Sequence, residues 1–196
     1  MKKNRKNRPP LPLYVREQLL YLARQSIADH LFQMNSAAHV YVDPLASFKA
    51  GAFVTLTLDG QLRGCIGLVE ALEKVPIIIR EMAVAAATRD PRFDPVTQEE
   101  LVYLDIEISI LSELFEIQSP DEIVIGQHGL LVRTEHHQGL LLPQVAEQTG
   151  WNAREFLSAT CRKAGLAPDY WEKNEIQIFA FNAEIFSEQE VREEYL

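Results

Sequence analysis

Two side chains that could do chemistry together stand close in the segment Arg63-Gly64-Cys65-Ile66-Gly67. A cysteine thiolate is a strong nucleophile, and a neighbouring guanidinium favours the thiolate over the thiol. The segment therefore predicts a reactive thiol at Cys65. The alternative is a small buried hydrophobe, because free cysteine is among the most buried residue types. The spacing leaves both interpretations open.

A β-hairpin is expected to position this segment. Two runs rich in β-forming residues, 52–58 and 61–69, are separated by Asp59-Gly60. Asp-Gly between such runs is the strongest short-range signal for a two-residue hairpin turn. The sequence therefore predicts an antiparallel pair of strands with Arg63 and Cys65 on the second strand.

In a regular ladder from this turn, Arg63 pairs with Leu56 and Cys65 with Val54, so both side chains project from one face. A guanidinium among apolar side chains needs a partner, because burying an unpaired charge costs several kcal/mol. We expect either a carboxylate of the protein or an anionic ligand beside Arg63.

Glycines flank the thiol at positions 64 and 67. Glycine inside a strand loses packing unless a bulge or another group must approach the backbone closely. Gly64 and Gly67 are therefore candidate ligand contacts beside Arg63 and Cys65.

A charged loop with two prolines follows a helical segment rich in alanine. Its residues Arg89 and Arg92 would build an anion site with Arg63 if the fold brings them together. The alternative is a corner held by local ion pairs of the arginines with Asp90 and Asp94. Both interpretations remain open from sequence.

The histidines offer a weaker candidate for a metal site. His136-His137 falls at a predicted hairpin tip, and His128 lies in a turn between glycines. No HExxH, CxxC or carboxylate cluster completes a ligand set, and motifs for nucleotide binding are absent. We predict neither a metal nor a cofactor. A polar strand face explains Asp105 and Glu107, and core packing explains Cys161.

The remaining pattern predicts an α+β fold with a mostly antiparallel sheet packed by helices. Apolar residues at helical spacing predict a helix over 14–32, and Pro76 opens a second, buried helix ending at Thr88. Clean alternation predicts a strand over 103–111, and short strands are expected at 123–125, 130–134, 140–142 and 176–186. Helices are expected at 143–148 and 152–164.

Composition limits the kind of protein. The 196 residues carry a net charge of −9, yet residues 1–8 hold five basic residues and no acid. We interpret residues 1–13 as a basic, proline-rich arm and 14–196 as a single domain. An acidic body repels phosphate backbones, so nucleic-acid binding is not expected. No apolar run is long enough to span a membrane, and two distant cysteines suit a reducing cytoplasm.

The order of several short motifs resembles the AMMECR-type domain, the A component of the AmmeMemoRadiSam system. The resemblance covers roughly residues 14–187. It is carried by Leu62-Arg63-Gly64-Cys65-Ile66-Gly67, Arg89-Asp90-Pro91-Arg92-Phe93, Gly126-Gln127-His128-Gly129-Leu130, residues 140–146, Gly150-Trp151 and residues 161–166.

The resemblance implies an α+β fold with a larger and a smaller subdomain in one compact unit, and a groove near the signature strand. It suggests Arg63 and Cys65 as the site pair, with Arg89, Asp90, Arg92 and His128 as neighbours. It also implies association with a Memo-type protein and a radical-SAM protein.

Three functions follow as hypotheses. The first is a component of a pathway that modifies a small molecule or protein, in which Arg63 orients an anionic ligand and Cys65 is the nucleophile. The second is a non-catalytic adaptor that binds a peptide carboxylate through Arg63. The third is RNA binding through the basic arm and the loop arginines, which the acidic body disfavours.

Overall fold

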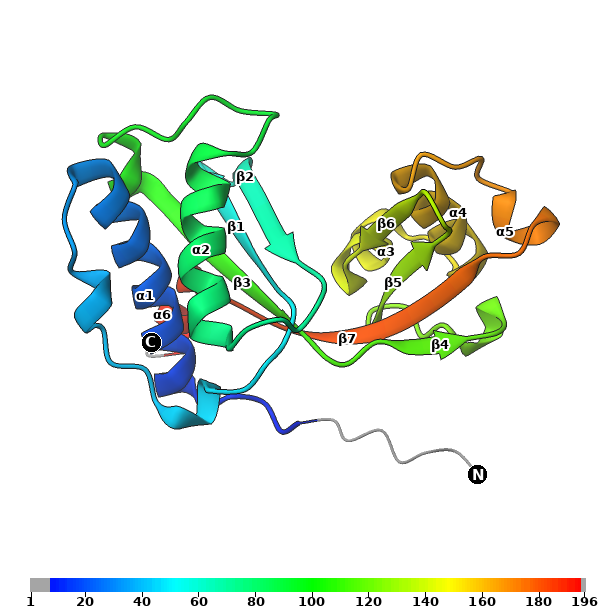
Figure 1. Cartoon of the computed structure of the whole chain (residues 1–196), viewed down its shortest axis with the longest axis horizontal. Helices are drawn as coiled ribbons and strands as arrows, with labels where there is room; N and C mark the ends of the chain where they lie inside the picture. The colour runs from blue at the N-terminus through cyan, green and yellow to red at the C-terminus, as the bar shows by residue number, and fades with distance from the viewer. Residues whose placement is uncertain (1–7, 195–196) are drawn as a thin grey trace. The chain divides into compact units, whose positions relative to one another are not determined.

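A computed structural model describes residues 8–194 of the chain. It divides into two compact units: a larger one that runs to Leu111 and resumes at Glu184, and a smaller one formed by Ser112–Ala183. Both combine helices with antiparallel strands (Figure 1). The predicted α+β class with a larger and a smaller part is confirmed.

Three antiparallel strands form the sheet of the larger unit, in the order β2-β1-β3. They are β1 (Ala52–Leu58), β2 (Gln61–Leu68) and β3 (Leu104–Leu111). The turn between β1 and β2 places Asp59 at φ 51° and Gly60 at φ 74°. Positive φ at both central residues defines a type I′ turn, which matches the twist of the flanking strands. The predicted hairpin is confirmed.

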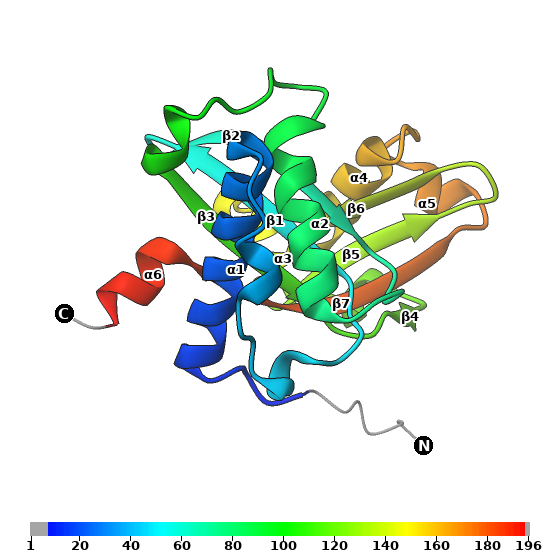
Figure 2. The ribbon, with the colours of Figure 1, turned by 60° about the vertical axis from the view of Figure 1, so that its left-hand side comes forward.

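Two long helices, α1 (Leu13–Phe32) and α2 (Val75–Thr88), lie side by side on one face of this sheet (Figure 2). The side chains of Val54 and Leu56 point toward these helices and are fully buried. Short 3-10 helices at Ala37–His39, Pro44–Ala46 and Glu100–Tyr103 complete the connections. A short helix, α6 (Glu188–Glu193), ends the unit.

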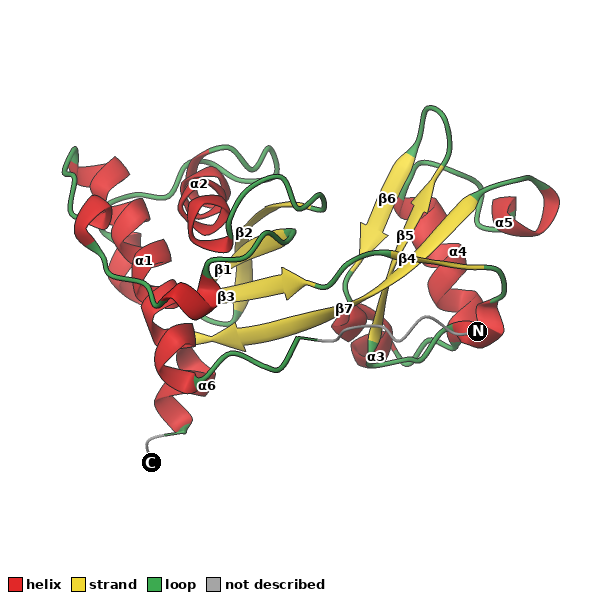
Figure 3. Ribbon diagram, turned by 60° about the horizontal axis from the view of Figure 1, so that its bottom comes forward, coloured by secondary structure: helices red, strands yellow, loops and turns green. Residues whose placement is uncertain are grey.

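The smaller unit has a sheet in the order β4-β7-β5-β6, with helices packed on it (Figure 3). Its strands are β4 (Phe115–Ile117), β5 (His128–Arg133), β6 (Gln138–Leu141) and the first part of β7 (Gln177–Ser187). Its helices are α3 (Pro143–Thr149), α4 (Ala153–Lys163) and α5 (Tyr170–Lys173), and a 3-10 helix covers Pro120–Glu122. Its separate core includes Leu130, Phe156 and Cys161.

One predicted strand of this unit is wrong. Residues 123 and 124 have no regular secondary structure and Ile125 begins a turn, although Ile-Val-Ile has high β-propensity. The Val124 N–H donates to Nδ1 of His128, and its carbonyl accepts from the N–H groups of Gln127 and His128. These local bonds use the backbone groups that a strand would need. The strand β4 was not predicted.

The predicted basic arm falls partly outside the described residues, because residues 1–7 are not among them. Arg8 forms an ion pair with Glu184 and lies 4.2 Å from the ring centroid of Phe48. Leu11 is buried and donates its N–H to Glu184 Oε1 over 2.6 Å. The end of the arm therefore packs on the larger unit before α1 begins. No helix within residues 8–194 combines the length and apolar character needed to cross a membrane.

Candidate functional site

A β-bulge in β2 changes the register on which the site was predicted. Thr57 pairs with Leu62, but Leu56 then pairs with Gly64, so Arg63 is the extra residue. Beyond the bulge, Cys65 pairs with Thr55. The predicted pairs of Arg63 with Leu56 and of Cys65 with Val54 are therefore wrong, because a regular ladder was assumed.

The bulge moves Cys65 to the other face of the sheet. Val54 and Leu56 point into the core beneath α1 and α2. Successive side chains of a strand alternate between faces, so Thr55 and its partner Cys65 lie on the face opposite these helices. The thiol is half-buried rather than sealed in the core.

Arg63 turns toward the segment that precedes β3 and finds its partner there. Its Nε donates to Glu100 Oε1 over 2.9 Å and its Nη2 to Glu100 Oε2 over 3.0 Å. Its remaining contacts are with the carbonyl oxygens of Asp94 (2.8 Å) and Pro95 (3.3 Å). The hydrogen bond from Arg63 holds the pKa of Glu100 below its usual value. Of the two expected partners for Arg63, the structure supplies the carboxylate.

Glu100 is itself fixed by reciprocal hydrogen bonds with Thr97, in the pattern of a capping box. The Thr97 N–H donates to Glu100 Oε2 over 2.7 Å, and the Glu100 N–H donates to Thr97 Oγ1 over 3.3 Å. The carboxylate therefore closes a helical turn and binds a guanidinium at the same time. This dual role binds Arg63 to the segment that precedes β3.

Gly64 and Gly67 lie against groups of the protein itself. A Cβ atom at Gly64 would overlap the carbonyl oxygen of Ala86 near the end of α2. A Cβ atom at Gly67 would overlap the ring of Phe53 on β1. The expected close approach to these glycines exists, and packing within the larger unit accounts for it.

The side chains of Asp90 and Arg92 hold the backbone of Cys65 from outside the sheet. Asp90 Oδ2 accepts the Cys65 N–H over 2.8 Å, and Arg92 Nη2 lies 3.5 Å from the Cys65 carbonyl oxygen. Arg92 also donates to Asp90 through Nε (2.9 Å) and Nη2 (2.6 Å). We call this pair the Asp90–Arg92 clamp. It occupies hydrogen-bonding groups that an edge strand normally leaves exposed.

The clamp is electrostatically strong because Asp90 is buried, with 4% of its surface exposed. Hydrogen bonds from Arg92, and further bonds from the backbone N–H groups of Cys65 and Arg92, hold the pKa of Asp90 well below its usual range. The same bond to Asp90 raises the pKa of Arg92, with a smaller contribution from Cys65.

A row of polar side chains crosses the three strands beside the clamp. Thr55 Oγ1 donates to Cys65 Sγ over 3.4 Å, and Thr55 also pairs with Glu107 on β3. Burial raises the pKa of Glu107, and the nearby carboxylates of Glu190 and Asp105 raise it further. We call Cys65, Thr55 and Glu107 the polar row. Sequence reasoning missed Thr55 and treated Glu107 as part of an exposed face.

Comparison with known proteins gives this arrangement a family. The AMMECR1 family matches residues 20–186. The chain belongs to the AMMECR1 family. A protein of Methanothermobacter thermautotrophicus is 42% identical over 177 residues, covering 87% of this chain and 92% of the relative. One of Methanosarcina mazei is 42% identical over 178 residues, covering 86% and 89%.

A solved structure of the family has the same fold. It is an uncharacterised protein from Pyrococcus horikoshii, with a TM-score of 0.83 and 36% sequence identity, and the match covers 91% of this chain and 94% of the other. The motif Arg63-Gly64-Cys65-Ile66-Gly67 and the Asp90–Arg92 clamp both lie inside the part that matches the AMMECR1 family.

Two further predicted site residues of this AMMECR1-family chain are Arg89 and His128. Arg89 is exposed and lines a pocket of 410 Å³ between the ends of α1 and α2, together with Asp29 and Arg80. His128 belongs to the smaller unit, where it is buried and packs edge-on against Phe115. Cys161 is fully buried in the core of that unit, as predicted.

The site has no ligand set for a metal. Within residues 8–194, no three His, Cys, Asp or Glu side chains come close enough to hold an ion. His136 lies 3.9 Å from Glu135 at the exposed tip of the β5–β6 hairpin. Cys65 contacts the Thr55 hydroxyl through its sulfur, and Asp90 and Arg92 through its backbone.

Proposed function

We propose that this AMMECR1-family chain is the thiol-bearing component of a pathway that modifies an anionic small molecule or protein group, with Cys65 as the nucleophile. The supporting observation is the Asp90–Arg92 clamp. It fixes the Cys65 backbone through both its N–H and its carbonyl group, and leaves the thiol half-buried beside a guanidinium. Fixed geometry on a regular element is what a reacting side chain requires.

In this proposal Arg92, rather than Arg63, binds the anionic group. Arg63 is occupied by Glu100 and two carbonyl groups. The side chain of Arg92 is 50% exposed, and its Nη1 donates no hydrogen bond to any of residues 8–194. A carboxylate or phosphate group at Nη1 would be held beside Cys65.

The Thr55 hydroxyl holds the sulfur in position, because its Oγ1 donates a hydrogen bond to Cys65 Sγ over 3.4 Å. Since the sulfur accepts this bond, the thiol proton leaves to solvent, to which the half-buried thiol is open. We assign Cys65 the nucleophilic role and Arg92 the role of orienting the anionic group.

The proposal includes joint action with a Memo-type protein and a radical-SAM protein, on the support of the family resemblance. It places the chemistry in the cytoplasm, because it needs Cys65 as a free thiol and thiols stay reduced there. Mixing the purified proteins and measuring association by light scattering tests the partnership. Absence of any complex, with and without substrate extracts, would remove this part of the proposal.

The experiment that tests the chemistry compares two alkylating agents of similar size, neutral iodoacetamide and anionic iodoacetate. If Arg92 orients anions, the rate of Cys65 modification by iodoacetate relative to iodoacetamide falls about 3- to 10-fold in Arg92→Gln. Arg89→Gln is the matched control, since Arg89 is an exposed arginine of the same loop that lies in another pocket. Equal ratios in wild type and Arg92→Gln would reject the assigned role.

A further inference from the structure

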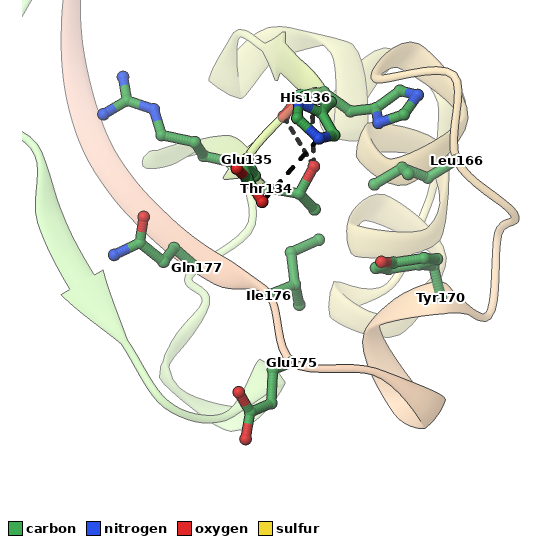
Figure 4. Close-up of a pocket in the computed structure, with 10 residues that line it drawn as sticks. Thr134, Glu135, His136, Leu166, Tyr170, Glu175, Ile176 and Gln177 are labelled. Atoms are coloured by element: carbon green, nitrogen blue, oxygen red, sulfur yellow. Dashed lines mark hydrogen bonds and ion pairs between the residues drawn. The ribbon is translucent and has the colours of Figure 1, made fainter.

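The smaller unit contains a pocket of its own, independent of Cys65. Its volume is 630 Å³, within the range of about 300–1,000 Å³ typical of ligand pockets. It is formed by the tip of the β5–β6 hairpin, the segment between α4 and α5, and the residues that lead into β7 (Figure 4). The proposed thiol chemistry uses none of these residues.

The floor of the pocket is apolar. Leu166, Tyr170 and Ile176 are half-buried, and their side chains face the same space in Figure 4. Leu166 and Ile176 also pack against the core of the smaller unit, so the floor is fixed in place. An aliphatic chain fits such a floor, and the Tyr170 ring offers a face for a cation.

Two carboxylates stand on the rim, from opposite sides of the pocket. Glu135 is 88% exposed at the side chain, and its ion-pair partner is His136 at 3.9 Å, which is itself 77% exposed. Glu175 lies on the strand side and forms no ion pair with any of residues 8–194. Both carboxylates are therefore available to a ligand of positive charge.

The two cations nearest the rim have partners other than Glu135 and Glu175. Arg133 also lines the pocket, but it donates from Nε to Gln138 Oε1 over 2.9 Å and lies over the ring of Phe179, at 5.8 Å. Phe179 alternates with the core residue Ile178 along β7, so this contact lies on the face of the sheet opposite the core. Lys173 pairs with Asp169.

The smaller unit as a whole is negatively charged, like the rim of its pocket. Residues 112–183 contain ten Asp and Glu against five Lys and Arg, a net charge of −5. A unit of this charge attracts cationic partners and repels anionic ones over roughly one Debye length, about 8 Å at physiological salt.

We propose that this pocket binds a lysine or arginine side chain presented by a protein segment. The aliphatic stem lies on Leu166 and Ile176, and the charged group contacts the Tyr170 ring and is attracted by the two carboxylates. The three apolar side chains offer more contact area to a peptide with a neighbouring apolar residue than to a free amine.

Titration of the full chain with acetyl-Leu-Arg-Ser-Lys-Leu-amide at pH 8, followed by two-dimensional NMR, tests the proposal. The shifts should centre on the amides of Tyr170 and Ile176. Glu175→Gln and Tyr170→Leu should each weaken binding roughly 3-fold, the second through loss of the cation–π contact. Glu147→Gln, an exposed carboxylate of the same unit outside the pocket, should leave the affinity unchanged.

Two probes decide the ligand class. The peptide in which glutamine replaces arginine and lysine should bind at least 10-fold more weakly, and cadaverine should bind more weakly than the basic peptide. Equal binding of the glutamine peptide would reject recognition of charge. Equal binding of cadaverine would assign the pocket to free amines and overturn the peptide proposal. Glu175→Gln changes an exposed side chain, so its result does not depend on folding.

Discussion

The two units of this protein use the same construction and treat their cysteines differently. In each, a glycine on a strand lies against the end of a helix: Gly64 meets Ala86 in the larger unit, and Gly139 meets Ala164 in the smaller one. Cys161 lies inside the helix of such a contact and is sealed in the core. Cys65 lies on the strand, facing away from the helices, and stays half-buried.

This difference shows that the position of a thiol in a helix-on-sheet packing decides what it can do. Burial raises the pKa of Cys161, which keeps that thiol protonated and inert. The Cys65 sulfur accepts a hydrogen bond from the Thr55 hydroxyl, and Asp90 and Arg92 contact the Cys65 backbone. Among the described residues, no ion pair like the Asp90–Arg92 clamp binds the backbone of Cys161. Substitutions in the clamp therefore test the difference between the two cysteines first.

Removing the clamp should have the largest effect on stability. Asp90→Ala leaves the Cys65 N–H without its partner and Arg92 without its carboxylate. Leaving such groups unpaired at a buried position should lower the free energy of unfolding of the larger unit by about 3 kcal/mol. Urea unfolding followed by circular dichroism measures it.

Asp94→Ala is the matched control, because Asp94 is exposed and contributes its carbonyl oxygen rather than its carboxylate to Arg63. Its effect should stay within about 0.5 kcal/mol. Since the pKa of Asp90 is lowered in the folded state, its contribution is present above the unfolded pKa and lost below it. The deficit of Asp90→Asn should therefore shrink as the pH falls below about 4. A deficit that does not change with pH would contradict the ionised clamp.

The shared construction predicts equal sensitivity of the two glycines. Gly64→Ala and Gly139→Ala each place a methyl group against helix backbone that cannot move freely. Each should destabilise its unit by about 2 kcal/mol, the typical effect of overpacking. Thermal unfolding of the two variants measures both effects. If only one variant is destabilised, the units do not share this packing device.

Replacement of each cysteine by serine should affect stability differently at the two positions. Cys161→Ser buries a hydroxyl in the apolar core of the smaller unit and should cost about 1–2 kcal/mol. Cys65→Ser should change the free energy of unfolding by less than about 0.5 kcal/mol, because its surroundings are polar and partly open. Comparable losses in both variants would make Cys65 a core residue and remove its proposed role.

The smallest predicted effect concerns Glu107. Because burial raises the pKa of Glu107, its ionisation opposes folding once the pH exceeds the unfolded pKa. Glu107→Gln should match wild type at pH 4 and exceed it by up to about 0.5 kcal/mol at pH 7. Unfolding curves at the two pH values check the sign. A loss of stability at pH 7 would show that the carboxylate is needed in its charged form.

Local pattern was sufficient to predict the framework around the site. Helical spacing located α1, and Asp59-Gly60 located the hairpin and its turn. The bulge at Arg63 was not predictable from the turn, because it depends on Gly64 meeting Ala86 and on Glu100, 37 residues away. The prediction of a strand at 123–125 was wrong for a similar reason, because the backbone conformation at Val124 depends on a bond to the His128 ring.

The sequence predicted several residues of the site but not how they are arranged. The sequence identified Asp90 and Arg92 as a local ion pair or a shared anion site, and the structure shows the ion pair closed on the Cys65 backbone. No sequence pattern marked Thr55 as a site residue, because only the shifted register places its hydroxyl group beside the Cys65 sulfur. The register of β1 and β2 depends on both strands and on the loop that contains Asp90, which binds the edge of β2.

Native labelling of the two cysteines tests the central claim most directly. The intact protein is treated with iodoacetamide without denaturant, and the modified residues are identified by peptide mass spectrometry. The clamp and the half-buried thiol predict one label per chain, at Cys65, with Cys161 modified only after unfolding. Protection of both cysteines, or faster modification of Cys161, would contradict a thiol held ready for chemistry at Cys65.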